Sequence, residues 1–118
     1  MRNYLLVTKA LADESRIRIL KLLEDGGLCV CQIMAVIGLS QSTISKHLSI
    51  LKTAGLVDDR KEGIWIYYHL CQDKISEYNL PMLKLINNWL KEDKKVKEDR
   101  KKLTEIKRID IKELCSKY

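Results

Sequence analysis

Two cysteines separated by a single valine, Cys29 and Cys31, are the side chains of this 118-residue chain best suited to binding chemistry. Thiolates select soft or borderline ions such as Cu(I), Zn(II), Cd(II), Pb(II), As(III) and Sb(III). The pair stands at the expected start of a short helix, where the helix dipole favours thiolate over thiol. We therefore predict a soft metal or metalloid site, the simpler alternative being two small core residues.

The one-residue spacing restricts how this pair can bind one ion. Side chains two positions apart on a helix point to nearly opposite sides. Both sulfurs can reach the same ion only if residues 28–31 are non-helical or unwind. Such unwinding would strain the next helix, whose orientation is expected to set the affinity for DNA.

The remaining cysteines, Cys71 and Cys115, are candidates for a further ligand. An As(III) site takes three thiolates, and the local pair supplies two. Cys115 is the preferred third ligand because a terminal helix could fold back, or cross a dimer, to reach Cys29; Cys71 is the second choice. Oxidation of Cys29 and Cys31, or of one of them with Cys115, is the alternative use of these thiols.

The expected helix over residues 41–53 has an apolar stripe on one face and small polar side chains on the other. A helix fits the major groove, where short polar side chains on its N-terminal half reach base edges and phosphates. Gln41 can pair bidentately with adenine, and Lys46 can reach a phosphate or guanine. The simpler alternatives are a solvated face and, for His47, a local hydrogen bond. The residues expected to contact DNA are Gln41, Ser42, Thr43, Ser45, Lys46, His47, Arg60 and Lys61.

Periodicity and capping residues place these side chains on a small set of elements. Helices are predicted by apolar spacing and by N-caps and glycine stops; they cover residues 2–12, 13–25, 30–37 and 41–53. After Gly55 the period changes to two, which predicts strands at 56–60 and 64–70. Arg60 and Lys61 then lie at the tip of the hairpin. The fold class is mainly α with a β-hairpin wing, a dimeric winged helix-turn-helix over residues 1–90.

The last third of the chain is expected to be helical. Met82, Leu85, Ile86 and Trp89 recur at helical spacing and form an apolar stripe. Residues 91–118 are a charged, helical C-terminal extension with an apolar thread. This extension is expected to pack on a partner subunit or to be a loosely held tail.

Composition sets the class of partner and the compartment. The net charge is +6, and residues 91–118 contribute +4 of it through eleven Lys/Arg against seven Asp/Glu, so the charge is weak support for DNA. No apolar run is long enough for a membrane span, and the N-terminus lacks a signal-peptide pattern, so a cytoplasmic protein without a membrane partner is expected. In that compartment we expect the four cysteines to serve as thiols for metal or redox chemistry rather than to form structural disulfides. No CxxC motif or acid/base partner supports a thiol enzyme.

Four segments together resemble the ArsR/SmtB family of metal-responsive repressors over about residues 4–90. They read LADESRIRIL, LCVCQI, GLSQSTISKHLSILKTAGLV and DRKEGIWIYYHL, and the last two resemble the family's DNA helix and wing. The resemblance implies a homodimer held by the first and last core helices and an operator with two-fold symmetry. It also implies repression without ligand, release when the ion binds, and autoregulation of a resistance operon.

The CVC segment at residues 29–31 is similar to the family's arsenite-sensing branch and also to a cadmium/lead branch. The arsenite branch often has a third cysteine where this chain has Met34, whereas the cadmium/lead branch takes further thiolates from an N-terminal extension. We expect a repressor that binds double-stranded operator DNA and has no resident cofactor. As(III) or Sb(III) would bind to Cys29, Cys31 and Cys115 and release the repressor from the DNA. The alternatives are a Cd(II)/Pb(II) sensor, a thiol redox switch and a purely architectural DNA binder.

Overall fold

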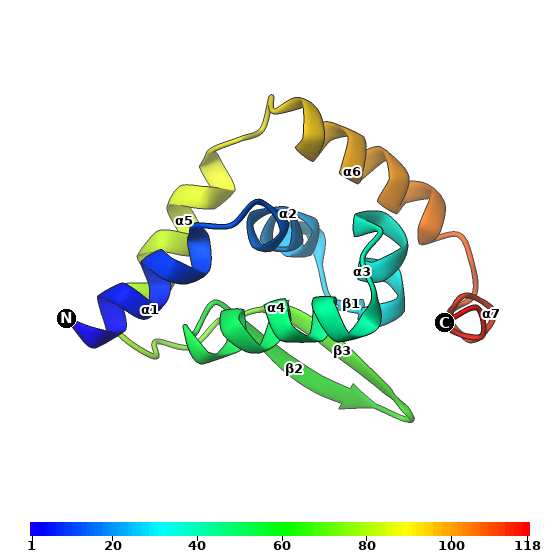
Figure 1. Cartoon of the computed structure of the whole chain (residues 1–118), viewed down its shortest axis with the longest axis horizontal. Helices are drawn as coiled ribbons and strands as arrows, with labels where there is room; N and C mark the ends of the chain where they lie inside the picture. Colours follow the sequence, from blue (N-terminus) through cyan, green and yellow to red (C-terminus); the bar gives the residue numbers. More distant parts are fainter.

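The computed structural model describes residues 1–118 as seven α-helices, one 3₁₀ turn and three strands (Figure 1). Their bounds are α1 Arg2–Leu11, α2 Glu14–Leu22, η1 Leu23–Asp25, β1 Leu28–Cys29, α3 Val30–Ile37, α4 Gln41–Thr53, β2 Val57–Glu62, β3 Trp65–Leu70, α5 Asn79–Asn88, α6 Lys94–Ile106 and α7 Ile111–Cys115. The expected mainly α fold with a β-hairpin wing is confirmed.

Local signals account for the helix-turn-helix. The side chain of Asp13 accepts a hydrogen bond from the backbone N–H of Arg16 (3.0 Å) and caps α2. Gly38 ends α3 with a φ of +82°, a conformation that residues with a Cβ rarely adopt. Ser40 then caps α4 through the N–H of Thr43 (3.3 Å). The α3–α4 turn is therefore fixed by residues within it.

One apolar core holds α2, α3, α4 and the root of the wing together. Its most deeply buried large side chains are Ile19, Leu20, Leu28, Ile33, Ile44, Leu48, Leu51 and Leu56. Burying a side chain of this size stabilises the fold by about 1.5–3 kcal/mol before entropy costs. The core side of α4 is thereby fixed, and its polar side is left outward.

The sheet has the strand order β1-β3-β2 with antiparallel pairing throughout. Two features differ from the expectation. The two-residue strand β1 was not predicted; it pairs Leu28 with Tyr68 and Cys29 with Tyr67. The hairpin turn is Gly63-Ile64, because Gly63 takes a φ of +63° and Glu62 pairs with Trp65. Arg60 and Lys61 consequently lie within β2, not at the tip.

The C-terminal helices pack on their own chain. Leu103 of α6 joins the main core, and Val96 and Leu114 are buried as well. In Figure 1, α6 arches over α2 and α3 on the side opposite the wing, and α7 lies beside α3 at the end of the molecule far from α1. The extension is therefore helical, as expected, and is not a loosely held tail, whereas its packing on a partner subunit stays a prediction.

The stripe predicted on α5 is divided between two environments. Leu83 and Ile86 enter the core, whereas Leu85 and Trp89 remain 43% and 54% exposed. On the neighbouring α1, Tyr4 and Leu5 are 46% and 40% exposed. Tyr4 stacks edge-on against Tyr78, just before α5, with ring centroids 5.5 Å apart. The two helices thus share an uncovered apolar surface.

No helix is long and apolar enough to cross a membrane.

Candidate functional site

Three of the four cysteines gather at one end of α3. The sulfurs of Cys29, Cys31 and Cys115 all lie within 4.8 Å of one another. Cys31 and Cys115 form a disulfide with their Cα atoms 5.4 Å apart, and Cys29 is a free thiol beside it. We call these residues the thiol cluster. The structure thus brings together the three cysteines expected as ligands.

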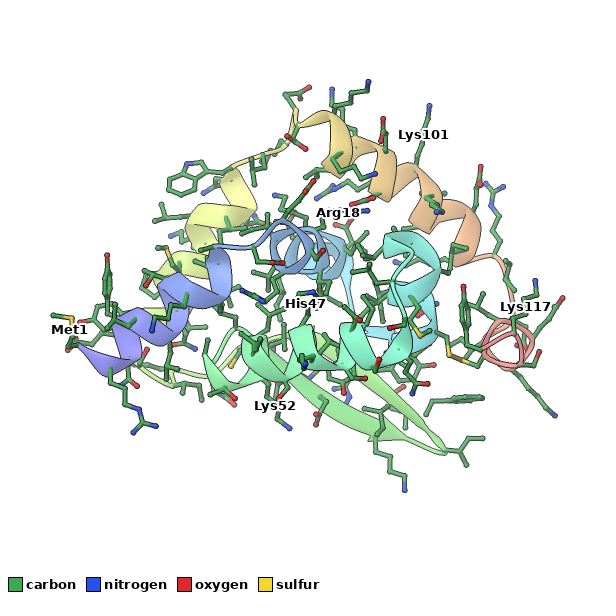
Figure 2. The ribbon with its side chains drawn as sticks, viewed as in Figure 1. Met1, Arg18, His47, Lys52, Lys101 and Lys117 are labelled. Atoms are coloured by element: carbon green, nitrogen blue, oxygen red, sulfur yellow. A yellow bond between two sulfur atoms is a disulfide. The ribbon has the colours of Figure 1, made fainter.

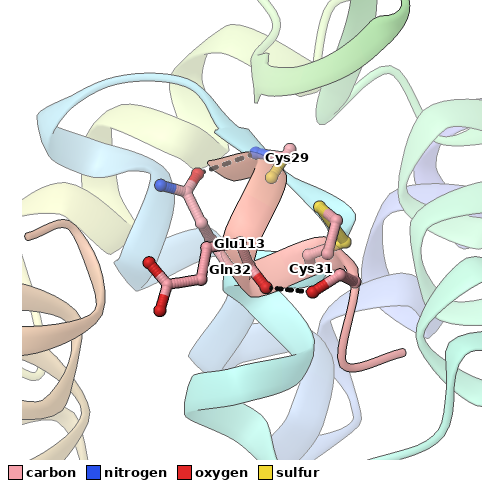
Figure 3. Close-up of a disulfide and its surroundings, with 6 residues drawn as sticks. Cys29, Cys31, Gln32 and Glu113 are labelled. Atoms are coloured by element: carbon pink, nitrogen blue, oxygen red, sulfur yellow. Dashed lines mark hydrogen bonds between the residues drawn. A yellow bond between two sulfur atoms is a disulfide. The ribbon is translucent and has the colours of Figure 1, made fainter. Parts of the chain in front are cut away.

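The backbone at Cys29 explains how two cysteines at this spacing converge. Cys29 belongs to β1 and precedes α3 with extended dihedrals (φ −82°, ψ 162°), whereas Cys31 lies in the first turn of the helix. The side chain of Gln32 accepts a hydrogen bond from the N–H of Cys29 (3.0 Å) and holds this junction (Figure 3). Because residue 29 is already non-helical, convergence requires no unwinding of α3. Of the two routes expected for convergence, a non-helical segment or an unwound one, the structure adopts the first at residues 28 and 29.

The third cysteine is delivered by the C-terminal helices. Leu114 is buried against Cys29 and Cys31, with Ile106 and Ile109 packed around them. Earlier in α6, Asp99 accepts two hydrogen bonds from Arg18 of α2, at 2.7 and 2.9 Å; Figure 2 labels Arg18 on α2.

The hydrogen bond to Asp99 raises the pKa of Arg18 above its usual value, so the guanidinium stays charged. This ion pair fixes α6, and through α6 the position of Cys115.

The chemistry of the cluster suits a soft ion once the disulfide is reduced. Two sulfurs bound to one ion with bonds of about 2.3 Å can lie at most about 4.6 Å apart. That limit is twice the bond length and is reached when the sulfurs lie on opposite sides of the ion. The observed limit of 4.8 Å is within reach of small side-chain rotations. Cys29 and Cys31 are 2% and 9% exposed, and Cys115 is half-buried, so a bound ion would be shielded from water.

The two other sulfur-bearing residues considered for the site have different environments. Cys71 is buried beside Asn79, and its thiol donates to the carbonyl of Asp73 (3.3 Å). It belongs to the core and is not part of the thiol cluster. Met34, which is 5% exposed, lines the cavity next to the cluster.

That cavity has a volume of about 370 Å³ and opens between α3, the start of α4, the wing and α7. Its walls include the three cysteines of the thiol cluster, together with Gln41 and Ser45 of α4, the helix expected to read DNA and called the recognition helix below. Tyr118, which follows α7, lines it as well. The thiol cluster and two of the side chains expected to contact DNA therefore face the same space.

The polar face of α4 is open to solvent. Gln41, Ser42, Thr43, Ser45 and Lys46 are all exposed, as a groove-reading helix requires. Lys52, at the other end of α4, forms an ion pair with Asp59 of β2 (2.9 Å), and this hydrogen bond raises the pKa of Lys52. The pair links the orientation of the wing to that of α4.

His47 is held from behind by a residue that sequence reasoning missed. A guanidinium nitrogen of Arg16 lies 3.2 Å from Nδ1 of His47. The other two guanidinium nitrogens of Arg16 donate hydrogen bonds to the carbonyls of Ala10 and Lys9. A guanidinium can only donate, so Nδ1 accepts and a neutral ring carries its proton on Nε2. No motif distinguishes Arg16 in the sequence, because the contact joins residues 31 positions apart.

Around this pair lies a second, shallower hollow of about 280 Å³. It is lined by Arg16, Ser42, Thr43, Lys46, His47 and Ile50. Cations and hydroxyl groups are the usual partners of DNA phosphates. The hollow therefore has the chemistry of a phosphate site at the edge of the recognition helix.

In the wing, the two expected basic contacts point in different directions. Arg60 shares a face of β2 with Glu62 and forms an ion pair with it (3.3 Å). Lys61 lies on the opposite face, because side chains alternate along a strand. The two residues therefore cannot contact the same side of the hairpin, and Glu62 offsets the charge of Arg60.

We expect Lys46→Ala and Gln41→Ala to weaken DNA binding in different ways. Loss of Lys46 removes a phosphate contact, so affinity for all sequences falls and the slope of log affinity against log salt decreases by about one. Loss of Gln41 relaxes base preference at one position, by about 1–3 kcal/mol. Salt titrations on operator and scrambled DNA measure both effects. Wild-type behaviour of both variants would mean that α4 is not the reading helix.

The chain matches the family described as bacterial regulatory proteins of the arsR family over residues 13–59. An HTH-type transcriptional regulator of Methanocaldococcus jannaschii, described as uncharacterized, is 49% identical over 72 residues, which are 60% of this chain and 81% of that protein. An arsenic resistance transcriptional regulator of Pseudomonas putida is 39% identical over 93 residues, 75% of this chain and 72% of its own length.

Among solved structures, the chain is similar to a homodimeric winged helix-turn-helix DNA-binding domain of Mycobacterium bovis. That protein is described as a possible ArsR-family transcriptional regulator. The TM-score is 0.62 at 33% sequence identity, and the match covers 74% of this chain and 77% of that one. The winged helix-turn-helix architecture is thus confirmed independently of the sequence pattern.

Proposed function

This chain belongs to the ArsR family and is a DNA-binding transcriptional repressor, and from that premise we propose that As(III) or Sb(III) releases it from its operator through the thiol cluster. Residues 1–90 would bind DNA and form the dimer, and residues 91–118 would supply the third thiolate. The relatives are transcription regulators, so a thiol enzyme is set aside.

One observation carries the proposal: three cysteine sulfurs within 4.8 Å share a cavity with Gln41 and Ser45 of α4. Arsenic in the +3 state is soft and binds thiolates, and three of them are in place after reduction. Cys115 reaches the cluster from its own chain. A site built this way needs no cysteine from a second subunit.

The ion would act by holding α7 against the start of the recognition helix. As(III) bonded to Cys115 as well as to Cys29 and Cys31 keeps α7 and Tyr118 at the cavity that Gln41 and Ser45 also line. DNA would need to approach the same side chains, so ion and DNA would favour different arrangements. A hundredfold loss of DNA affinity corresponds to about 2.7 kcal/mol of coupling.

The dimer would form through the apolar surface shared by α1 and α5. Tyr4, Leu5, Leu85 and Trp89 are each at least 40% exposed there. Covering them removes apolar area from water, which is the usual driving force of an obligate interface. The similar domain from Mycobacterium bovis is described as homodimeric, which supports a dimer.

The direct test is fluorescence anisotropy of labelled DNA from upstream of this gene, titrated with As(III) and in parallel with Cd(II) under reducing conditions. We expect As(III) to release the DNA at lower concentration than Cd(II). Release by Cd(II) alone would make the protein a cadmium/lead sensor. Tight binding that ignores both ions would remove the metal site.

A second candidate function is a redox-controlled repressor, favoured by the disulfide between Cys31 and Cys115. Its formation fixes α7 in the same place that a bound ion would. Peroxide would then release DNA without any metal, and the disulfide would appear by thiol counting and mass spectrometry. Retention of DNA by the fully oxidised protein would exclude this alternative.

A further inference from the structure

The positive charge of this chain lies mostly away from the helix that is expected to read DNA. Of the net charge of +6, residues 91–118 contribute +4, which leaves only +2 for residues 1–90 with α4 and the wing. On the side of α4 and the wing, Lys52 and Arg60 each form an ion pair with an acidic residue of the wing. Recognition of the operator through α4 therefore does not account for most of the excess charge.

Basic side chains form one line along the outer face of α6. Lys94, Lys97 and Lys101 follow one another at spacings of three and four and therefore share a face of the helix. Arg108 comes seven positions after Lys101, in a turn where its N–H still donates to the carbonyl of Glu105 (3.2 Å). All four basic residues are exposed. We call Lys94, Lys97, Lys101 and Arg108 the basic stripe.

Most of the charge in this segment is not neutralised within the chain. The buried acid of α6, Asp99, is used by Arg18, and within the basic stripe only Lys97 has an ion pair, with Glu92. Like charges three or four positions apart destabilise a helix, so folding does not explain the stripe. The basic residues of the segment 91–108 that form no ion pair are Lys91, Lys94, Lys101, Lys102, Lys107 and Arg108.

The shape of the basic stripe suits an extended polyanion. Its charges lie in a line on the convex face of a helix, whereas a small anion needs donors that converge on one point. At about 1.5 Å per residue the stripe is about 21 Å long. Duplex DNA presents about one phosphate charge per 1.7 Å of its axis, which is about twelve over that length.

A lipid surface fits this helix less well than DNA does. A helix that lies on a membrane inserts its apolar face between the lipids. In α6 that face is already occupied, because Val96 and Leu103 are buried within the chain at 3% and 6% exposure. Only the charged face of α6 is free to meet a partner.

The basic stripe and α4 lie on opposite sides of the molecule. In Figure 1, α6 arches over α2 and α3 on the side away from the wing. In Figure 2, Lys101 stands on the outer side of α6, whereas Lys52 of α4 lies at the other edge. A straight duplex seated on α4 therefore runs along the side of the molecule away from the stripe.

We propose that the basic stripe holds a second DNA duplex, so that a repressor seated on its operator bridges two DNA segments. Phosphate contacts carry no sequence information, so this second duplex is bound without sequence preference. The inference goes beyond the proposed function and uses only the seating of the operator on α4. DNA on either side of the operator is the nearest source of a second duplex, because it is tethered at high effective concentration.

The test adds a second duplex to a preformed complex. Reduced protein with a stoichiometric amount of unlabelled operator is titrated into a labelled duplex of equal length that lacks the operator sequence. Fluorescence anisotropy of the label measures binding between about 50 and 200 mM salt. Four phosphate contacts predict a slope of log affinity against log salt of about −3.6.

A triple variant of the stripe locates the contact. Lys94→Gln, Lys101→Gln and Arg108→Gln together remove three charges and keep long side chains that favour a helix. We expect the affinity of the complex for the second duplex to fall by about tenfold or more at low salt, and the slope to decrease by about 2.7. Affinity for the operator by itself should stay within about twofold, because the stripe lies far from α4 relative to the screening length.

The matched control removes the same charge elsewhere. Lys9→Gln, Lys74→Gln and Lys84→Gln change three exposed lysines that form no ion pair and lie outside the stripe. This variant should bind the second duplex as the wild-type complex does. An equal loss in both triple variants would mean that net charge, not the stripe, attracts DNA, and would overturn the inference.

Other outcomes would also count against the second duplex. No rise in anisotropy with the wild-type complex at the lowest salt would overturn the inference, and so would a stripe variant that binds as the wild type does. Stripe-dependent binding to phosphatidylserine vesicles that is tighter than binding to the duplex would assign the surface to a membrane instead. Release of a single operator duplex by arsenite is measured separately, so the proposed function stands or fails independently of these results.

Discussion

Replacing Cys31 with serine is expected to make the release of operator DNA by arsenite far less sensitive, while the reduced protein still binds that DNA. Cys31 is the member of the thiol cluster that sits within α3, and it is the partner of Cys115. A hydroxyl is a hard, weak ligand for As(III), so the cluster would lose one of its three bonds to the ion. The arsenite concentration for half-release should rise by about a hundredfold or more.

The matched control is Cys71→Ser, the same atom change at a buried cysteine outside the cluster. Serine can keep the hydrogen bond that Cys71 makes to the carbonyl of Asp73. This variant should respond to arsenite as the wild type does, in the same anisotropy titration. An unchanged response in Cys31→Ser would remove the thiol cluster from the mechanism, and loss of response in both variants would point to a general effect on folding.

Removing the carboxylate of Asp99 is expected to destabilise the protein by about 3 kcal/mol and to loosen the C-terminal helices. Asp99 is 4% exposed and binds Arg18 through both oxygens, so Asp99→Ala leaves a largely buried guanidinium without its partner. Urea unfolding measures the loss of stability. Hydrogen exchange of α6 and α7 should quicken more than that of α4.

Glu98→Ala, at the neighbouring position, is the control. Glu98 is exposed, and its ion pair with Lys95 is long (3.9 Å) and therefore weak. Its effect should be within about 0.5 kcal/mol. Asp99→Asn keeps the shape of the side chain and tests the charge alone. Equal stability of Asp99→Ala and Glu98→Ala would mean that α6 is held by its apolar contacts and not by this ion pair.

The Asp99 prediction also bears on the thiol cluster, because α6 carries α7 and with it Cys115. If the ion pair fixes α6, then Asp99→Ala should slow formation of the Cys31–Cys115 disulfide and weaken the arsenite response. We expect Cys29 and Cys31 to remain together in that variant, since neither the pairing of β1 with β3 nor the hydrogen bond from Cys29 to Gln32 involves α6. Removal of this one carboxylate would thus distinguish the contribution of Cys115 to the arsenite response from that of the local pair, Cys29 and Cys31.

Local signals were sufficient for the DNA-binding half of this protein. Caps at Asp13 and Ser40, the glycine at residue 38 and the 3.6-residue spacing of apolar side chains act within a few positions. Such signals fix where a helix begins and ends and which of its faces is buried. The winged helix-turn-helix and the exposure of the polar face of α4 could therefore be predicted from the sequence alone.

Contacts between distant residues decided the rest. Cys29 leaves the helix because β1 pairs it with Tyr67, and Arg16 meets His47 only when α2 packs across α4. Cys115 reaches Cys31 across 84 residues because α6 returns over α2 and α3. Sequence periodicity carries no information on which distant segments pair, since that choice follows from burial of the whole chain at once. The motif therefore determined the class of chemistry, and only the tertiary structure decided which thiol and which cavity complete it.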